Sequence, residues 1–507
     1  MLETLNQGFQ LFFSFYNFVA LFIGVAVGVF LGAIPGMTAT MAVALTLPFT
    51  FALEPVVGIL LLLGVYKGGI YGGSIPAILV KTPGTPASSC TVLDGYPMAA
   101  RGEAGKALET ALYASCIADV ISNIALICFA GLLASLAMQF GPPEFFTLIL
   151  FSLTIIAGVS GENLVKGLLA AGLGLTAATI GLDLVYGTDR FLFGSTELMG
   201  GLSFIPVLVG LFALPEIIAY YGRRHDHVVS RALGHAGVTW QEFRRCLKSI
   251  VRGSLLGVVM GTIPGIGGAP SAFLSYSEAQ RTSPNRQNFG RGEMEGVAAS
   301  EAGNNGVAGA TLIPLLALGI PGDIITAIIL GAFMIHGLQP GPVLFQQNLD
   351  MIYALFMGIL LSSVFLLVVG KAGIRLFRRV AEIPRSLLFP MVLVLCTFGS
   401  YAVNGTMFDV LVMVVMGFVG FAMMLTGLPA APFLIAFILG PMLEDNFRRA
   451  MLMGQGDPGI FFRNEICIFF WVLTVVTVGF MVWRNLKKAG WVDGQASPGD
   501  GRVSGDS

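Results

Sequence analysis

The sequence predicts an all-α polytopic membrane protein, on three observations. Hydrophobic residues make up 55% of the 507 positions and charged residues 11%, with a mean hydropathy of +0.83. A soluble globular chain of this length does not have that composition. Five segments lack Asp, Glu, Lys and Arg and are each about as long as a bilayer-spanning helix or longer: 4–53, 120–143, 351–370, 410–443 and 466–483. These runs are continuous, whereas a membrane β-barrel would show short alternating segments.

The apolar runs predict roughly 10–12 transmembrane helices by the length rule. The run 407–443 is interrupted by Pro429 and Pro432, so it is either one bent crossing or two. Seven Lys/Arg lie between residues 222 and 252 and five more between 371 and 385, which predicts that both loops are cytoplasmic. The tail that begins at Arg484 is also basic. The start of the chain has Glu3 and no cation, so we expect no cleaved signal peptide and a start outside the cytoplasm.

Two phrases occur twice, in the same order. "GVAVGVFLGAIPG" at 24–36 returns 229 positions later as "GSLLGVVMGTIPG" at 253–265. "SIPAILVKTPGT" at 74–85 returns 238 positions later as "LIPLLALGIPGD" at 312–323. Combined with the charge pattern, this predicts two inverted-topology repeats. We place the first membrane repeat at 10–221, a cytoplasmic basic linker at 222–249, the second repeat at 250–484 and a disordered cytoplasmic tail at 485–507.

The glycines of the first phrase are spaced four apart, which is typical of close helix packing. The Ile-Pro-Gly ending differs, because proline removes an amide donor and glycine permits irregular dihedrals. Each phrase should therefore break a helix inside apolar sequence, which a membrane tolerates only where protein or water covers the backbone. Broken helices or re-entrant hairpins at matching places in two halves indicate the binding site of a secondary transporter.

Half-helix N-termini attract anions, while freed carbonyls and hydroxyls hold a cation such as Na⁺. The strongest expectation for a carboxylate is Thr82, Thr85, Ser88 and the amides near Gly84 and Gly322, with Asn304 and Asn305 contributing. The full set predicted to bind substrate is Lys67, Ser74, Thr82, Pro83, Gly84, Thr85, Ser88, Glu301, Asn304, Asn305, Pro321, Gly322 and Asp323. The set predicted to bind Na⁺ is Gly36, Thr38, Thr40, Gly265, Gly267 and Ser271.

Several of these residues have two interpretations. Lys67 either attracts an acidic substrate, or it snorkels or pairs with an acid. Asp323 either caps the next helix or binds a cation. Glu301, Asn304 and Asn305 share one helix face and are interpreted as a site, whereas Ser115, Asp119, Ser122 and Asn123 are explained equally well by contacts between helices.

No enzymatic motif is present: the chain has no G-x4-GK-[ST], no G-x-S-x-G and no H-E-x-x-H. We therefore predict a protein that is not an enzyme and that needs no cofactor beyond a coupling ion. A passive channel is the alternative class. A carboxylate transporter with another coupling ion and substrate is the nearest alternative within the same class.

Five phrases together resemble the large permease subunit of the tripartite tricarboxylate transporters, the TctA family. They are "GAIPGMTATMAVALTLPFTF", "YGGSIPAILVKTPGTPASSCTVLDGYPMAARGEAGKAL", "GTIPGIGGAPSAFLSY", "GVAASEAGNNGVAGATLIPLLALGIPGD" and "GLQPGP". The resemblance covers about residues 10–480. It implies a multi-pass protein of the bacterial inner membrane that imports citrate-like tricarboxylates or other carboxylates. It also implies a periplasmic TctC-like solute-binding protein, a small TctB-like membrane subunit and a driving ion gradient, usually sodium. The chain departs from the family pattern at Lys67 and Lys81, where uncharged residues are commoner, and at Asp323, where a small residue is usual.

Overall fold

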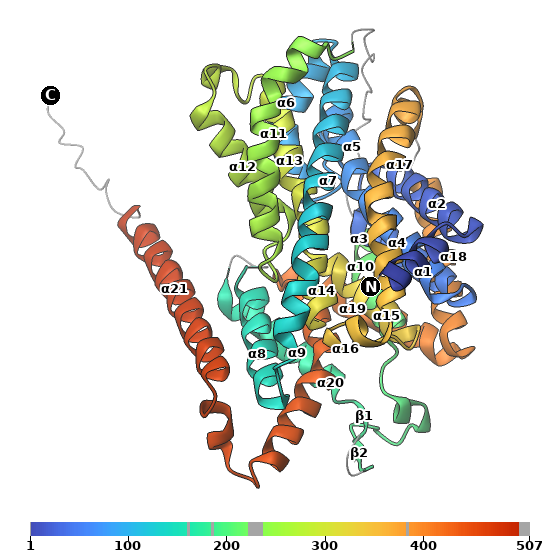
Figure 1. Cartoon of the computed structure of the whole chain (residues 1–507), viewed down its shortest axis with the longest axis vertical. Coiled ribbons are helices and arrows are strands. Elements are labelled where there is room, and N and C mark those ends of the chain that lie inside the picture. The colour runs from blue at the N-terminus through green and yellow to red at the C-terminus, as the bar shows by residue number, and fades with distance from the viewer. Residues whose placement is uncertain (1, 160–162, 184–186, 222–236, 382–384, 496–507) are drawn as a thin grey trace, which may run out of the picture.

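The computed structural model describes residues 2–159, 163–183, 187–221, 237–381 and 385–495. Its regular structure is helical apart from a short hairpin, in which β1 (Gly181–Leu182) pairs antiparallel with β2 (Asp189–Arg190). Figure 1 shows long helices gathered into one bundle, with the hairpin at the lower end and α21 lying along one side. The prediction of an all-α polytopic membrane protein is confirmed.

The first half of the chain contains α1 (Leu2–Phe12), α2 (Phe15–Gly32), α3 (Ala39–Thr46), the 3₁₀ helix η1 (Leu47–Ala52), α4 (Pro55–Gly72), α5 (Ser74–Val80), α6 (Ser88–Ala100), α7 (Ala104–Ala137), α8 (Pro142–Val159), α9 (Leu164–Ala178), η2 (Thr196–Gly200) and α10 (Phe204–Tyr221). The second half contains α11 (Trp240–Gly261), α12 (Gly268–Thr282), η3 (Arg286–Asn288), α13 (Met294–Ala310), α14 (Leu312–Leu318), α15 (Ile324–Ile335), α16 (Pro342–Gln347), α17 (Leu349–Ala381), α18 (Arg385–Asn404), α19 (Met407–Thr426), α20 (Ala430–Met453), η4 (Pro458–Phe462) and α21 (Glu465–Gln495).

Eight of the described helical segments are long and apolar enough to cross a membrane. Five further apolar helices are shorter, including α9, α15 and the segment of α3 with η1. The expected 10–12 crossings stay a prediction, because shorter helices can span only part of a bilayer. The run 407–443 contains two helices, α19 and α20, because the chain breaks at Gly427 and Pro429 begins the next helix as its N-cap.

Both copies of the first repeated phrase break a helix in the same way. In the first half, α2 ends at Gly32 and the chain turns through Gly36, whose φ is 85°, into α3. In the second half, α11 ends at Gly261 and the chain turns through Gly265, whose φ is 86°, into α12. A side chain is strained at such φ values, so glycine suits both turns. The predicted helix breaks at Ile-Pro-Gly are confirmed.

The second repeated phrase breaks its helices with matching hydrogen bonds. The amide of Thr82 donates to the Pro76 carbonyl at 3.2 Å, and 238 positions later the amide of Ile320 donates to the Pro314 carbonyl at 3.2 Å. The residue that ends the helix is left-handed in both copies: Lys81 after α5, and a glycine after α14. The two phrases are therefore repeated in backbone conformation as well as in sequence.

The four-residue glycine spacing packs parallel helices against each other. A Cβ added at Gly28 of α2 would lie 2.3 Å from the carbonyl oxygen of Val65 in α4. In the second half, a Cβ at Gly261 of α11 would lie 2.9 Å from the carbonyl oxygen of Val307 in α13. Such distances leave no room for a side chain, so these glycines allow backbones to approach closely, as the sequence predicted.

Gly28→Ala is expected to destabilise the chain by about 1–3 kcal/mol, because α2 and α4 must move apart to fit the methyl group. The measurement is the thermal unfolding of the detergent-purified protein. The control is Gly172→Ala in α9, where an added Cβ meets nothing within 4 Å. Equal stability of Gly28→Ala and the wild type would contradict the close packing of α2 on α4.

In the second half, α13 runs in the same direction as α7. Ser115 of α7 contacts Glu301 of α13 at 3.1 Å, and further along both helices Ser122 contacts the Gly306 carbonyl at 2.6 Å. Both contact pairs advance together in residue number, so α7 and α13 are parallel.

In the first half, α4 and α5 run in the opposite direction to α7. Lys67 of α4 contacts Asn123 of α7 at 2.7 Å, whereas Ser74 of α5 contacts Glu301, which lies beside Ser115. The first half therefore moves back along α7 as its residue numbers rise. Equivalent segments run in opposite directions, as an inverted repeat requires. The boundaries of the repeats and the membrane side of each loop stay predictions.

Two boundaries differ from the expected ones. Residues 222–236 of the predicted linker lie outside the described residues, but its later part belongs to α11, which begins at Trp240. Thr239 and Glu242 form a capping box there, which starts the helix ahead of residue 250. The hydrogen bond from Lys106 lowers the pKa of Glu242 to about 2, so this pair joins α7 and α11 as ions at neutral pH. At the other boundary α21 continues to Gln495, so 485–495 is helical, and 496–507 lies outside the described residues.

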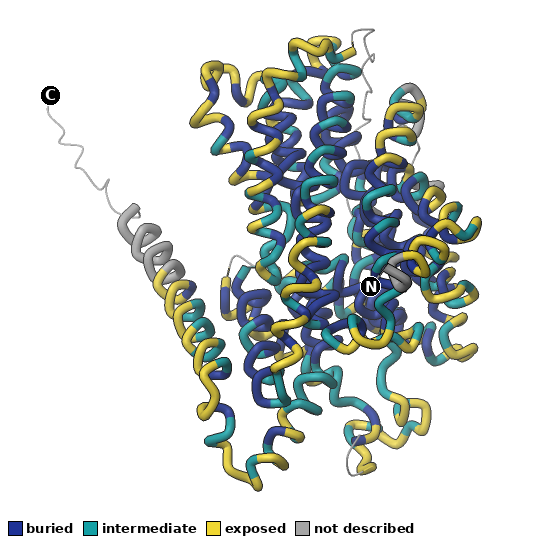
Figure 2. Tube along the Cα trace, in the orientation of Figure 1, coloured by how far each residue is buried: buried dark blue, intermediate teal, exposed yellow. Residues whose placement is uncertain are grey.

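The buried part of the molecule lies where the broken helices of the two halves meet. Figure 2 shows buried segments through the middle of the bundle and exposed ones around its outside and along α21. The segment Pro55–Val80, which contains α4 and α5, is the most enclosed of the candidate membrane spans, with 94% of its apolar window buried. Every residue of α13 from Gly296 to Ala310 is buried as well. A helix that is buried on all sides in a membrane bundle contacts protein and not lipid. Such helices are therefore suited to form a binding site.

Candidate functional site

A cavity of about 500 Å³ lies between the broken helices of the two halves. Its walls come from α3, α4, the end of α8 and the segment 85–87 before α6, from α12, α13 and α15 of the second half, and from α10 and α20. A volume of this size is typical of small-molecule sites. Some of the residues that were predicted to bind substrate or Na⁺ line this cavity: Thr38, Thr40, Thr85, Gly265, Gly267, Asn304 and Asp323.

Equivalent positions of the two repeats line this cavity together. Thr85 and Asp323, which are 238 positions apart, both line it, and so do Tyr66 and Asn304, which are separated by the same offset. Thr38 and Gly267 form a third pair, at the offset of 229 that relates the first repeated phrases. The cavity is therefore built twice from the same backbone elements, with different side chains in each copy.

Four helix N-termini open onto the cavity. α3 begins after Thr38, whose hydroxyl accepts from the Met41 amide at 3.1 Å, and α12 begins at Gly268. α6 begins beside Thr85, and α15 begins after Asp323. Each N-terminus carries roughly +0.5 of an elementary charge, so their convergence makes the cavity favourable for an anion.

Asn304 supplies a side-chain donor to this cavity. Its side chain is 4% exposed, and its Nδ2 has no hydrogen-bond partner within the described part of the structure. Its Oδ1 points to Gly268, where an added Cβ would lie 2.7 Å from it. A buried amide without a partner is costly unless a ligand or water satisfies it. Its position on the cavity wall fits a donor to a bound acceptor.

Asp323 caps α15, as one of its two predicted interpretations required. Its Oδ1 accepts from the Thr326 amide at 2.7 Å, and the Thr326 hydroxyl completes a capping box. Its other oxygen, Oδ2, accepts from the Tyr66 hydroxyl at 3.2 Å. That hydroxyl also contacts Thr311 at 3.1 Å, so a residue of α4 is held against the second half.

Several residues predicted to bind ligand are engaged by the protein instead. The Gly84 amide donates to the Gly73 carbonyl at 3.1 Å, and the Gly322 carbonyl accepts from the Gly265 amide at 2.7 Å. Ser271 is buried and donates to a backbone carbonyl of α13 at 2.8 Å. The remaining predicted residues that do not line the cavity are Gly36, Lys67, Ser74, Thr82, Pro83, Ser88, Glu301, Asn305 and Pro321. Their roles in binding stay predictions.

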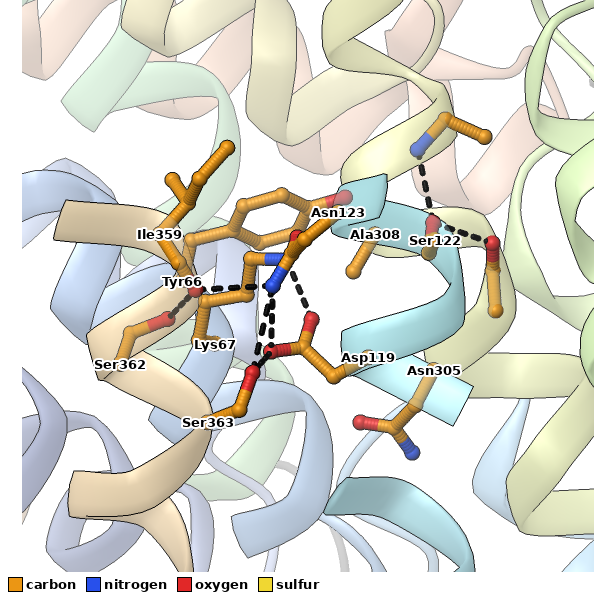
Figure 3. A network of polar contacts seen from close by, with 12 residues as sticks. Tyr66, Lys67, Asp119, Ser122, Asn123, Asn305, Ala308, Ile359, Ser362 and Ser363 are labelled. Atoms are coloured by element: carbon orange, nitrogen blue, oxygen red, sulfur yellow. Dashed lines mark hydrogen bonds and ion pairs between the residues drawn. The ribbon is translucent and has the colours of Figure 1, made fainter. Parts of the chain in front are cut away.

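Lys67 belongs to a buried network beside the cavity (Figure 3). It is 1% exposed, forms an ion pair with Asp119 of α7, and donates to Asn123 at 2.7 Å. Ser363 of α17 donates to the same aspartate at 2.6 Å. The alternative in which Lys67 pairs with a buried acid is therefore confirmed, and the polar face of α7 makes contacts between helices.

Glu301 is the centre of a second buried network that joins the two halves. Its Oε1 accepts from Ser74 of α5 at 2.6 Å and from Thr91 of α6. Its Oε2 accepts from Ser115 of α7 at 3.1 Å and from Asn305 at 3.3 Å. All four of these donors are neutral. Glu301 and Asn305 thus face the neighbouring helices, whereas Asn304 faces the cavity, although all three were expected to act on one face.

Sequence reasoning missed part of the cavity wall. Tyr66 was detectable, because it stands 238 positions before Asn304 and extends the second repeated phrase toward the N-terminus. Phe212, Glu216, Ala431 and Ile435 come from α10 and α20, which are apolar helices without a repeated motif. Among the described residues, no group of three or more His, Cys, Asp or Glu side chains could hold a metal ion.

Comparisons with known proteins give a consistent result. The model of the tripartite tricarboxylate transporter TctA family matches residues 18–435. An "Uncharacterized 52.8 kDa protein in TAR-I ttuC' 3'region" of Agrobacterium vitis is 36% identical over 467 residues, which cover 92% of this chain and 93% of that protein. An "Uncharacterized protein in TAR-II ttuC' 3'region" of the same organism is 36% identical over 210 residues, 41% of this chain and 87% of that protein. No solved structure matches the chain.

Proposed function

The chain belongs to the tripartite tricarboxylate transporter TctA family, and from that premise we propose that it imports carboxylates, driven by an ion gradient. As a member of this family, the chain is a component of a transporter. It also has many apolar helices. The proposed cargo is a citrate-like tricarboxylate or another carboxylate, and the proposed coupling ion is Na⁺. The proposed partners are a small TctB-like membrane subunit and a periplasmic TctC-like solute-binding protein. The proposed location is the inner membrane of a bacterium.

The convergence of four helix N-termini on one cavity is the observation that carries this proposal. Each N-terminus stabilises a nearby anion by about 0.3–2 kcal/mol, and these contributions act on a charge that the apolar surroundings would otherwise exclude. The unpartnered Nδ2 of Asn304 adds a directional donor. A carboxylate matches both features, because it is an anion with two oxygens that accept hydrogen bonds. We place one substrate carboxylate between Asn304 and the N-terminus of α6 at Thr85.

The position of the cavity supports alternating access. Its walls combine the broken helices of both halves with α10 and α20. Movement of the repeated core against these other helices would open the same cavity first to one side of the membrane and then to the other. Because the two halves run in opposite directions, each half would present an equivalent helix break to one side of the membrane.

Asn304→Ala and Thr85→Ala are each expected to lower the affinity for the transported carboxylate by about tenfold or more, because each removes a hydrogen bond to a charged group. The measurement is uptake of radiolabelled citrate and of C4 dicarboxylates by cells that express the chain with both partner subunits. The matched control is Thr154→Ala in α8, whose hydroxyl donates to the Leu150 carbonyl of its own helix and to no other group among the described residues.

Wild-type uptake by both variants, at equal amounts in the membrane, would contradict the assignment of the cavity. Collapse of the sodium and proton gradients provides a separate test of the transport class. Gradient-driven import predicts that accumulation stops when both gradients are removed. Uptake that continues unchanged under those conditions would instead identify a passive channel.

A further inference from the structure

The two copies of the repeat place different side chains at one equivalent position of the cavity wall. Thr85 and Asp323 hold equivalent positions, and the side chain of each accepts from the backbone amide three residues further on. In the first half the Ser88 amide donates to Thr85 Oγ1 at 3.1 Å. In the second half the Thr326 amide donates to Asp323 Oδ1 at 2.7 Å. The backbone design is the same, but one copy is neutral and the other carries a carboxylate.

We propose that the two equivalent positions bind different ligands, with the substrate carboxylate beside Thr85 and a monovalent cation on the carboxylate of Asp323. This inference rests on the proposed function, because it assigns the coupling ion to one position in the same cavity. The cation is a sodium ion or a proton. Either cation would neutralise Asp323 while an anionic substrate is bound in the same cavity.

The composition of the cavity wall supports a cation at Asp323. The described lining residues include two acids, Asp323 and Glu216 of α10, but no Lys, Arg or His. Lys67, which follows the lining residue Tyr66 in α4, is itself bound to Asp119 and Asn123 and does not line the cavity. The lining residues of α3, α12, α13 and α20 and of the segment 85–87 are uncharged. A substrate anion and an ionised Asp323 would therefore share the cavity without a cationic side chain among the described lining residues.

The geometry at Asp323 provides oxygens for that cation. Oδ1 is used by the cap, whereas Oδ2 is held by the Tyr66 hydroxyl, beside the hydroxyl of Thr311. A sodium ion in proteins binds carboxylate, hydroxyl and carbonyl oxygens at broken helices of this kind. A proton would instead make Oδ2 a donor, and the Tyr66 hydroxyl could then accept from it.

The two ligands must then strengthen each other. A cation on Asp323 removes repulsion from the substrate, and by linkage the bound substrate raises the affinity for the cation by the same factor. Removal of the carboxylate should break this coupling and leave the position beside Thr85 intact. Asp323→Thr is the suitable change, since the Thr85 hydroxyl already accepts from the equivalent amide, that of Ser88.

The experiment uses the full-length chain purified in detergent, with ²²Na⁺ and radiolabelled citrate as probes. We expect saturable ²²Na⁺ binding by the wild type that Asp323→Thr weakens by at least about tenfold. Tyr66→Phe, which keeps the cap, should weaken it by a smaller factor. Asp445→Asn is the control, because this exposed acid pairs with Arg449 outside the cavity, and it should bind sodium as the wild type does.

The second measurement detects a proton. Citrate binding in weakly buffered solution should take up one proton per chain if the cation is a proton, and this uptake should be absent in Asp323→Thr. Sodium binding or proton uptake that depends on Asp323 supports the inference. Their absence in the wild type, or their persistence in Asp323→Thr, overturns it. If citrate binds equally to both proteins at every sodium concentration and pH, the inference fails while the proposed function stands. Sodium binding lost in Asp323→Thr without binding of any carboxylate supports the cation site and contradicts the proposed function.

Discussion

Lys67→Met is expected to lower the free energy of unfolding by about 3–5 kcal/mol, because it leaves the carboxylate of Asp119 buried without its cation. Both side chains are 1% exposed, so water cannot replace the lost partner. The remaining donors to Asp119 are Asn123, at 3.1 Å, and Ser363, at 2.6 Å, and both are neutral. The loss should appear as a lower thermal midpoint of the detergent-purified chain.

The double variant Lys67→Met with Asp119→Asn provides the matched comparison. Replacement of both members of a buried ion pair by neutral groups is often close to neutral in stability, whereas loss of one member is not. The double variant should therefore regain most of the stability that Lys67→Met loses, and the coupling can be measured as a double-mutant cycle. If the two single effects simply add, the ion pair does not explain the buried lysine.

The same pair of variants separates a structural role of Lys67 from a binding role. Lys67 does not line the cavity, so the folded double variant should bind carboxylate with wild-type affinity. Loss of binding by a double variant of restored stability would return Lys67 to the substrate site. Near-wild-type binding would show that this departure from the family pattern is compensated inside the protein by Asp119.

Glu301→Ala is the second large effect, with an expected loss of about 3 kcal/mol of unfolding free energy. The substitution removes the acceptor of four neutral donors from four helices: Ser74, Thr91, Ser115 and Asn305. Hydrogen bonds to a carboxyl group are worth about 0.5–3 kcal/mol each, but the hydroxyls regain part of this by turning to one another. The measurement is again thermal unfolding of the purified chain.

Glu301→Gln is the control for shape, since glutamine keeps the side-chain volume and one acceptor oxygen. Glu301→Gln should lower the free energy of unfolding by about 1 kcal/mol. The NH₂ group of glutamine faces hydroxyls that donate to Glu301, and these must rotate before they can accept from it. A Glu301→Ala protein as stable as Glu301→Gln would mean that the network does not hold α5, α6, α7 and α13 together. Selective loss of carboxylate binding in a stable Glu301→Gln protein would instead favour the predicted binding role.

The positions of the helix breaks were predictable from the sequence, because proline and glycine act on the backbone of their own segment. Proline removes an amide donor, and glycine permits the φ of 85° at Gly36 and 86° at Gly265 without help from distant residues. The repeated phrases therefore indicated both the breaks and their equivalence. The composition likewise predicted the class of protein, since continuous apolar runs can be solvated only by lipid or by one another.

The direction of each side chain was decided by the tertiary structure. Asn304 and Asn305 are adjacent amides in one helix, yet one faces the cavity and the other faces Ser115 of α7. Lys67 and Tyr66 are also adjacent, and only the tyrosine reaches the cavity. Successive positions on a helix differ by about 100°, so only the packing of neighbouring helices determines which of the two meets the cavity.

The sequence alone thus determined that this chain is a repeated, broken-helix membrane protein, because local backbone chemistry and overall hydropathy do not depend on distant contacts. Only the tertiary structure decided that Lys67 and Glu301 hold helices together while Asn304, Thr85 and Asp323 surround a cavity. The physical reason is that a buried polar group acquires its role from the partner that satisfies it. Those partners, such as Asp119 for Lys67 and Tyr66 for Asp323, lie far away along the chain.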